Sequence, residues 1–234
     1  MRLHEVYSNI RKPIMEGGNV FNGTTSFTYD MVPGMLDQLN KVIGVKNIPI
    51  GSGASPTKKQ MGDLDVIVDQ DALAKKFGVE KPAELRKALR AAFDAAGFET
   101  GQSGISVHVK LPMADHAHQA DIMVVPNAEE VATYHKHDIP QDSPYKGKHK
   151  QIAMSKLANS KGMMWSGFQG LFARDPETNK KADLVSSNLD DIAKKLIGDN
   201  ATAKDLGSVE SILAALPPDR AAELQAELEA DPNA

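Results

Sequence analysis

Two aspartates separated by one residue, Asp63 and Asp65, are the side chains in this sequence best suited to carry out chemistry. They open the segment from Gly62 to Asp69, whose β-branched content predicts a strand, and residues two apart on a strand project from the same face. Neighbouring carboxylates repel each other and are costly to bury unpaired, so a divalent cation is their natural counter-ion. Hard oxygen ligands suit Mg²⁺ or Mn²⁺, and two such ions about 4 Å apart activate an attacking hydroxyl and stabilise a leaving pyrophosphate.

A third carboxylate, Asp121, lies in the predicted strand from Gln119 to Val125, where it is the one acidic residue in an otherwise apolar run. We expect this strand to lie beside the strand that carries Asp63 and Asp65. The three carboxylates would then converge on one metal site.

A Gly-Ser pair, Gly51-Ser52, ends a short predicted strand and stands ten residues before Asp63. The full pattern is Ile50-Gly51-Ser52, ten residues, Asp63-Leu64-Asp65-Val66, and a later Asp121-Ile122. This pattern resembles the DNA polymerase β-like nucleotidyltransferase superfamily over about residues 48–125. A weaker resemblance links the chain to the small nucleotidyltransferases encoded by tailed bacteriophages.

The resemblance implies a role for each of these residues. Gly51 and Ser52 would contact the triphosphate of a bound NTP, and Asp63 and Asp65 would bind both metal ions. Asp121 would bind the catalytic metal and help to deprotonate the acceptor hydroxyl. The implied reaction moves a nucleoside monophosphate from an NTP to an acceptor hydroxyl on RNA, a protein or a small molecule, and releases pyrophosphate.

Two further groups of basic residues are candidates for phosphate contact. Lys58 and Lys59, in the loop before Asp63, would neutralise triphosphate charge, or they are a solvated loop tip. The segment 135–150 is rich in lysine and histidine and includes Tyr145, a composition that suits contact with phosphate and base; the alternative is a solvated start of a helix.

Other notable side chains fit structural roles better. Asp69 is expected to cap the following helix. His108 is expected to be packed or exposed rather than catalytic, and His116 to His118 to lie in a hairpin link without forming a zinc site. Trp165 and Phe168 are expected in the core, with closure of the pocket as the alternative.

Hydrophobic spacing predicts the elements that must position these side chains. Helices are expected at Phe27–Val45, Gln70–Phe77, Pro82–Ala96, Lys148–Asn159, Leu184–Ile197, Val209–Leu216 and Arg220–Ala230, and strands at Asn47–Ile50, Gly62–Asp69, Ser103–Leu111 and Gln119–Val125.

This order predicts an α+β fold, with a nucleotidyltransferase-type mixed β-sheet flanked by helices and a mostly helical C-terminal region after it. We expect an N-terminal arm over residues 1–25, a catalytic domain over 26–130 and the helical region over 131–234.

Composition narrows the class of protein. The chain has 234 residues, no cysteine and a net charge of −4, so it has no disulfide and no thiolate metal site, and any nucleic-acid contact must be local. No apolar run reaches the ~20 residues that cross a bilayer, so we expect a cytoplasmic protein that does not contact membranes. The sequence does not indicate an oligomeric state.

Two other classes of function stay open beside the transferase. A catalytically inactive nucleotidyltransferase fold would serve as a binding or structural module. A metal-dependent phosphodiesterase or nuclease would use the same carboxylates, but the Gly-Ser turn before them disfavours it, because such a turn is a triphosphate-binding feature.

Overall fold

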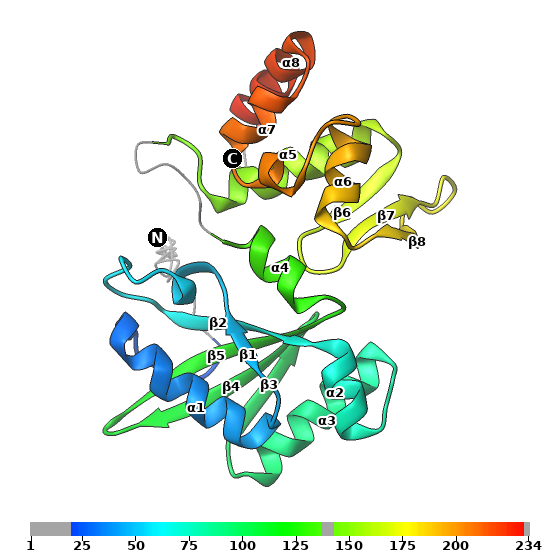
Figure 1. Ribbon diagram of the computed structural model, residues 1–234. Helices are drawn as coiled ribbons and strands as arrows, with labels where there is room; N and C mark the ends of the chain where they lie inside the picture. The colour runs from blue at the N-terminus through cyan, green and yellow to red at the C-terminus, as the bar shows by residue number, and fades with distance from the viewer. Residues whose placement is uncertain (1–19, 137–142, 232–234) are drawn as a thin grey trace, which may run out of the picture.

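A five-stranded mixed sheet and the three helices packed on it form the first half of the protein, in a computed structural model that describes residues 20–136 and 143–231 (Figure 1). The strands and helices of this half follow the predicted chain order except for one added strand, Glu99–Ser103, and a 3₁₀ turn where the Gly-Ser pair lies. The elements of this half are η1 (Tyr29–Met31), α1 (Val32–Ile43), β1 (Asn47–Pro49), η2 (Gly51–Ala54), β2 (Asp63–Asp69), α2 (Gln70–Phe77), α3 (Pro82–Ala95), β3 (Glu99–Ser103), β4 (Ser106–Met113) and β5 (His116–Val125).

The strand order is β1-β2-β5-β4-β3, and its central pair, β2 and β5, is parallel. The other three pairs are antiparallel. A parallel pair cannot be closed by a tight turn, so the chain leaves β2 and returns through α2, α3 and the hairpin β3–β4 before it forms β5. Two strands far apart in sequence thus become neighbours in the middle of the sheet.

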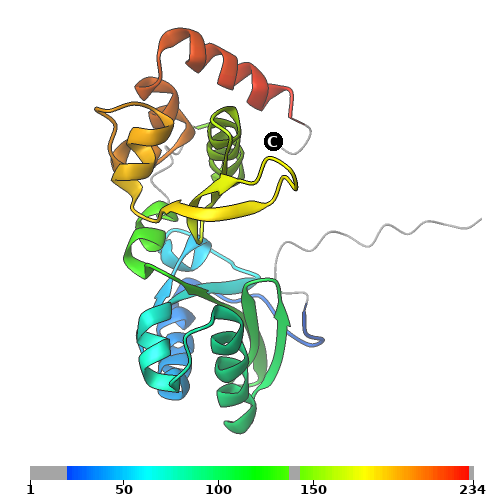
Figure 2. The ribbon, with the colours of Figure 1, turned by 90° about the vertical axis from the view of Figure 1, so that its right-hand side faces the viewer.

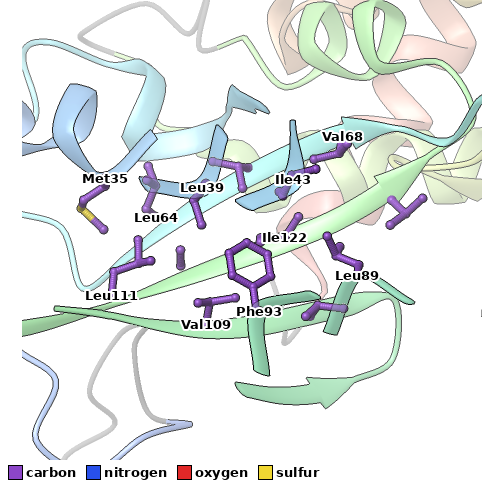
Figure 3. Packing of buried hydrophobic residues seen from close by; sticks show 14 of the residues in the cluster. Met35, Leu39, Ile43, Leu64, Val68, Leu89, Phe93, Val109, Leu111 and Ile122 are labelled. Carbon is purple, nitrogen blue, oxygen red and sulfur yellow. The ribbon is translucent and has the colours of Figure 1, made fainter. Parts of the chain in front are cut away.

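One face of the sheet is covered by α1, α2 and α3, which lie side by side on it (Figures 1 and 2). Leu85, Leu89 and Phe93 of α3 recur every four residues and are fully buried, as the helical spacing predicts. Figure 3 shows Phe93 packed among sheet residues that include Val109 and Ile122. This cluster is the main hydrophobic core of the first half.

Strand alternation sends the other side chains of the sheet to the opposite face, which we call the open face. Along β2, Leu64 and Val66 belong to the core, so Asp63 and Asp65 lie on the open face. Farther along the same strand Ile67 joins a second apolar cluster, which also contains residues of β5 and α4. The open face is therefore charged at the start of β2 and apolar toward its end.

The second half combines helices with a three-stranded antiparallel sheet in the order β6-β7-β8. Its core is formed mainly by α5, α6, α7 and α8, with Leu171 of the sheet and Tyr134 of α4. Its elements are α4 (Ala128–Tyr134), α5 (Gly147–Ser160), β6 (Met163–Ser166), β7 (Gly170–Arg174), β8 (Lys181–Ser186), α6 (Leu189–Leu196), η3 (Ala203–Leu206), α7 (Val209–Ala215) and α8 (Pro218–Glu229).

The predicted α+β fold, with a mixed sheet flanked by helices, is confirmed, and so is the helical character of the C-terminal part. The small sheet β6–β8 within that part was not predicted. The domain boundaries near residues 25 and 130 stay predictions, and residues 1–19 of the expected arm lie outside the described residues. Within residues 20–136 and 143–231, no helix is long and apolar enough to span a membrane.

Two strand predictions were wrong in detail. The segment 103–111 was expected to be one strand, but Gly104, with φ of 53°, turns the chain between β3 and β4. Strand β3 escaped prediction because Glu99–Ser103 is a polar edge strand without apolar alternation. His116 and His118 lie in β5 rather than in a turn, since the hairpin reverses at Ala114, whose φ is 51°.

Two helix predictions were also too long. The helix expected from Phe27 begins at Val32, because Phe27 instead pairs with Met61 through two backbone hydrogen bonds of 2.9 Å. The helix expected from Leu184 begins at Leu189, after a strand. Asn188 caps it, accepting a hydrogen bond of 3.1 Å from the backbone N–H of Asp191.

We predict that Phe93→Ala lowers the free energy of unfolding by about 3–5 kcal/mol, because it leaves a cavity where α3 meets the sheet. Urea denaturation followed by circular dichroism measures this change. Lys87→Ala, on the exposed side of the same helix, should stay within about 0.5 kcal/mol of the wild type. An equal loss in the two variants would contradict the assigned core.

Candidate metal and nucleotide site

Asp65 and Asp121 face each other across the parallel pair β2–β5, as partners in register. Asp63 pairs in the same ladder with Gln119, two residues before Asp121. Because register partners and residues two apart share one face, all three carboxylates lie on the open face. The structure thus places on one face the three aspartates that the sequence indicated, and their convergence on one metal site stays a prediction.

The Gly-Ser turn lies directly beside Asp65. The backbone N–H of Ile50 donates a 3.0 Å hydrogen bond to the carbonyl oxygen of Asp65, and this bond ties the start of η2 to β2. Gly51 has φ of 57°, and a Cβ added there would lie 3.7 Å from Oδ2 of Asp65. Gly53 lies closer still to β2, since a Cβ added there would be 2.6 Å from the side chain of Leu64. Glycines therefore let this turn, which also carries Ser52, approach the carboxylates.

Asp121 is held by two side chains that sequence reasoning did not assign to the site. The Nδ1 atom of His108, on β4, lies 2.8 Å from Oδ1 of Asp121. The amide Nε2 of Gln119 donates a 2.8 Å hydrogen bond to the same oxygen. The other ring nitrogen of His108 lies 2.7 Å from Oγ of Ser103. His108 and Gln119 are both buried, with exposed fractions of 5% and 1%.

The electrostatics of the site centre on Asp65. Burial raises its pKa, and the negative charges of Asp63 and Asp121 raise it further, to about 7 from the ordinary value of 3.8. In the metal-free protein this carboxyl therefore keeps its proton to a much higher pH than an ordinary aspartate does. A nearby cation would reverse this preference, because it favours the charged form.

Three acidic side chains on one face, with mutual repulsion strong enough to shift a pKa, fit a divalent cation as their counter-ion. Within the described ranges, however, no three carboxylate or imidazole groups are already clustered tightly enough to enclose an ion. Asp63, Asp65 and Asp121 would hold such an ion, drawn together by its charge.

Lys58 and Lys59 are exposed in the loop between η2 and β2. Its start is shaped by backbone hydrogen bonds such as that from Lys58 N–H to the carbonyl oxygen of Ser55, at 3.1 Å. The structure places both lysines on the loop that the sequence indicated, and their contact with a triphosphate stays a prediction.

The basic segment 135–150 is divided between surface and core. Lys146 and Lys148 are exposed, whereas Lys150 is buried, with its ammonium 4.3 Å from the centre of the Tyr134 ring. Lys150 also donates a 3.2 Å hydrogen bond to the carbonyl oxygen of Gly207. Lys150 therefore does not belong to the exposed basic part of this segment, because its charge is satisfied inside the second half. His137 lies outside the described residues.

The turn between β6 and β7 reaches the apolar end of the open face. Phe168 stacks on His135 with ring centres 4.5 Å apart, and it packs against the cluster that contains Ile67 and Met123. Trp165 packs against the core of the second half and donates a 3.1 Å hydrogen bond to Gln151. Both aromatic residues are packed, but each is partly buried at the edge of a core rather than inside it.

The sequence carries one signal for His108 and Gln119, the two residues that were not predicted as part of the site. His108 is polar between Val107 and Val109, and Gln119 precedes the apolar run around Asp121 at the same spacing as Asp63 to Asp65. Alternation alone puts these side chains on the open face. Their contact with Asp121 depends on the pairing of β4 with β5, which spacing does not reveal.

No family model matches this chain, and no curated protein matches it. Similar solved structures include a cytoplasmic RNA terminal U-transferase, with TM-score 0.35, 18% identity, and coverage of 62% of this chain and 46% of that one. They also include the Cid1 poly(U) polymerase with Mg and 3′-dATP bound, with TM-score 0.31, 18% identity, and coverage of 60% and 46%. The chain thus spans less than half of either relative, and its function must be argued from the site.

We predict that Asp65→Asn stabilises the metal-free protein at pH 8 by about 2 kcal/mol, a value discounted for partial exposure, and has little effect near pH 4. The raised pKa means that the protonated form stabilises the fold below pH 3.8, and this contribution is lost as pH rises through about 7. Urea denaturation at both pH values measures the difference.

The matched control is Asp115→Asn, at the exposed β4–β5 turn. Its stability should follow the wild type at both pH values. Mg²⁺ should raise the melting temperature of the wild type more than that of Asp65→Asn. The assigned electrostatics would be wrong if Asp65→Asn were no more stable than the wild type at pH 8.

Proposed function

We propose that this chain is a metal-dependent nucleotidyltransferase. It moves a nucleoside monophosphate from an NTP to an acceptor hydroxyl, and releases pyrophosphate. The observation that carries the proposal is the register of β2 with β5, which sets Asp65 opposite Asp121 with Asp63 on the same face. The Gly51–Ala54 turn beside Asp65 supports it, because it offers a close approach of backbone to a polyphosphate.

At phosphorus the reaction forms one bond and breaks one. The acceptor oxygen bonds to the α-phosphorus, the bond from that phosphorus to the bridging oxygen of pyrophosphate breaks, and the hydroxyl proton passes to the Asp121 carboxylate and from there to water. Two Mg²⁺ ions, when bound, neutralise the charge on the phosphates and activate the hydroxyl.

The residues of the chain position and neutralise rather than bond covalently to the substrate. Asp63 and Asp65 would hold the metals and, through them, the triphosphate. Gly51 and Ser52 would contact the phosphates by backbone and hydroxyl groups. Asp121 would hold the catalytic metal and accept a hydrogen bond from the acceptor hydroxyl, so its carboxylate must be aimed accurately.

The acceptor is proposed as RNA, a protein or a small molecule, and the NTP as any of the four. Exposed Lys146 and Lys148 support a polyanionic acceptor such as RNA, since they precede and open α5 in the second half. A catalytically inactive module with the same fold is the alternative, and the transfer experiment separates the two.

We predict that purified protein transfers label from one or more α-labelled NTPs to an acceptor in the presence of Mg²⁺ or Mn²⁺. Reactions with RNA, with a cell extract and without acceptor identify the acceptor by where the label appears. Asp63→Asn, Asp65→Asn and Asp121→Asn should each lower the rate by about 10²-fold or more, because each removes a metal ligand.

Asp115→Asn serves as the control, since its carboxylate lies at an exposed turn away from the site. It should retain the wild-type rate. Folded wild-type protein that transfers no label from any NTP to any acceptor would contradict the proposal and favour the inactive module. Transfer that survives all three active-site substitutions would move the chemistry to other residues.

A further inference from the structure

Two buried side chains converge on one oxygen of Asp121, and the proposed reaction has not yet used either of them. We propose that His108 is a positioning residue: it fixes the Asp121 carboxylate through Oδ1 so that the other oxygen is aimed at the metal and the acceptor hydroxyl. This inference rests on the proposed function and names a further determinant of the same site.

The two contacts come from different directions. His108 lies directly opposite Asp121 on the antiparallel strand β4, and its Nδ1 is 2.8 Å from Oδ1. Gln119 lies on the strand of Asp121 itself and donates from Nε2 to the same oxygen, also at 2.8 Å. A carboxylate held at one oxygen by donors on two sides cannot rotate freely about its own axis. Because both contacts use Oδ1, we assign Oδ2 of Asp121 to the metal ion and the acceptor hydroxyl.

Ser103 suits one tautomer of the imidazole. Its hydroxyl lies 2.7 Å from Nε2 of His108, so it can donate to Nε2 while Nδ1–H donates to Asp121. A hydroxyl can donate or accept, but a carboxylate only accepts, so this is the arrangement in which a neutral imidazole satisfies both partners. The chain Ser103–His108–Asp121 thus delivers a hydrogen bond to the carboxylate. Protein metal sites commonly orient their ligands through outer partners of this kind.

The imidazole of His108 lies in a confined space beside strand β3. Gly101, opposite His108 on β3, has no side chain, and a Cβ there would lie 3.7 Å from Cβ of His108 and 3.2 Å from Val20. The space above this glycine therefore admits both the imidazole and Val20. The backbone N–H of Val20 also donates a 3.0 Å hydrogen bond to Oε1 of Gln119. Val20 thus fixes the amide of Gln119, one of the two groups that hold Asp121.

The order serine, histidine, aspartate is also that of a nucleophilic serine site. Two observations favour positioning over nucleophilic catalysis. The aspartate belongs to a row of three carboxylates on the open face, and Gln119 binds the same oxygen as the histidine. Both features suit a carboxylate that itself binds a metal ion, rather than one that only orients a catalytic histidine.

The test compares His108→Leu with His108→Asn. Leucine fills the space but donates nothing, whereas the asparagine amide nitrogen is attached to Cγ, as Nδ1 is in histidine, and can donate to Asp121. Mn²⁺ binding, measured by electron paramagnetic resonance without nucleotide, gives a readout independent of turnover. His116→Leu, at an exposed histidine of β5, is the matched control.

We expect His108→Leu to weaken Mn²⁺ binding and lower kcat by about 10- to 100-fold, with KM for the NTP nearly unchanged, since the triphosphate is held at the Gly51 side. His108→Asn should restore most of both losses, and His116→Leu should match the wild type. If His108→Leu does not fold, Ser103→Ala should shift both quantities in the same direction by a smaller factor.

Wild-type Mn²⁺ affinity and kcat in His108→Leu would overturn the inference. So would an asparagine variant as defective as the leucine variant, because the ring rather than its donor would then matter. Covalent labelling of Ser103 by a fluorophosphonate would also overturn it, in favour of a nucleophile. If the wild type transfers no label but His108→Leu still weakens Mn²⁺ binding and His108→Asn restores it, the positioning role stands and the proposed function fails.

Discussion

The parallel pairing of β2 with β5 is the constraint on which the rest of this structure depends. It joins segments separated by two helices and a hairpin, and its register alone decides that Asp65 meets Asp121. A slip of one residue would turn Asp121 into the core and an isoleucine to the open face. The covered face prevents that slip, because β2 and β5 each place three apolar side chains against α1, α2 and α3. Hydrophobic packing on one side thus determines the charge arrangement on the other.

The open face combines two environments along the same strands. Asp63 and Asp65 are followed on β2 by Ile67, and Asp121 is followed on β5 by Met123, both within an apolar cluster capped by α4. The carboxylates therefore lie beside a buried apolar layer, and burial, together with the charges of Asp63 and Asp121, raises the pKa of Asp65. A site farther into the apolar layer would keep its carboxylates protonated. A site in open water would bind a cation weakly.

The sequence predicts the parts of this site that depend on local spacing. Asp63 and Asp65 share a face because of strand geometry, and Asp69 caps α2 with hydrogen bonds of 3.1 and 3.0 Å to the backbone, as expected. His108 could not be assigned, because its role depends on which strand becomes its neighbour. The burial of Lys150 was not predicted, because a buried lysine and an exposed one look alike in a sequence. In both cases the deciding contact joins segments that local patterns do not connect.

The strand that carries Asp121 is also the connection to the second half of the protein. It continues from Asp121 to Val125, and α4 begins at Ala128 after a break of two residues. Val125 and Ala128 belong to the apolar cluster against which Phe168 of the β6–β7 turn also packs. The second half therefore contacts the C-terminal end of β5 through α4 and through this turn. Strand β5 carries Asp121 near its middle and leads directly into the second half at its C-terminal end. Any displacement of the second half would therefore act first on the C-terminal end of the strand that carries Asp121.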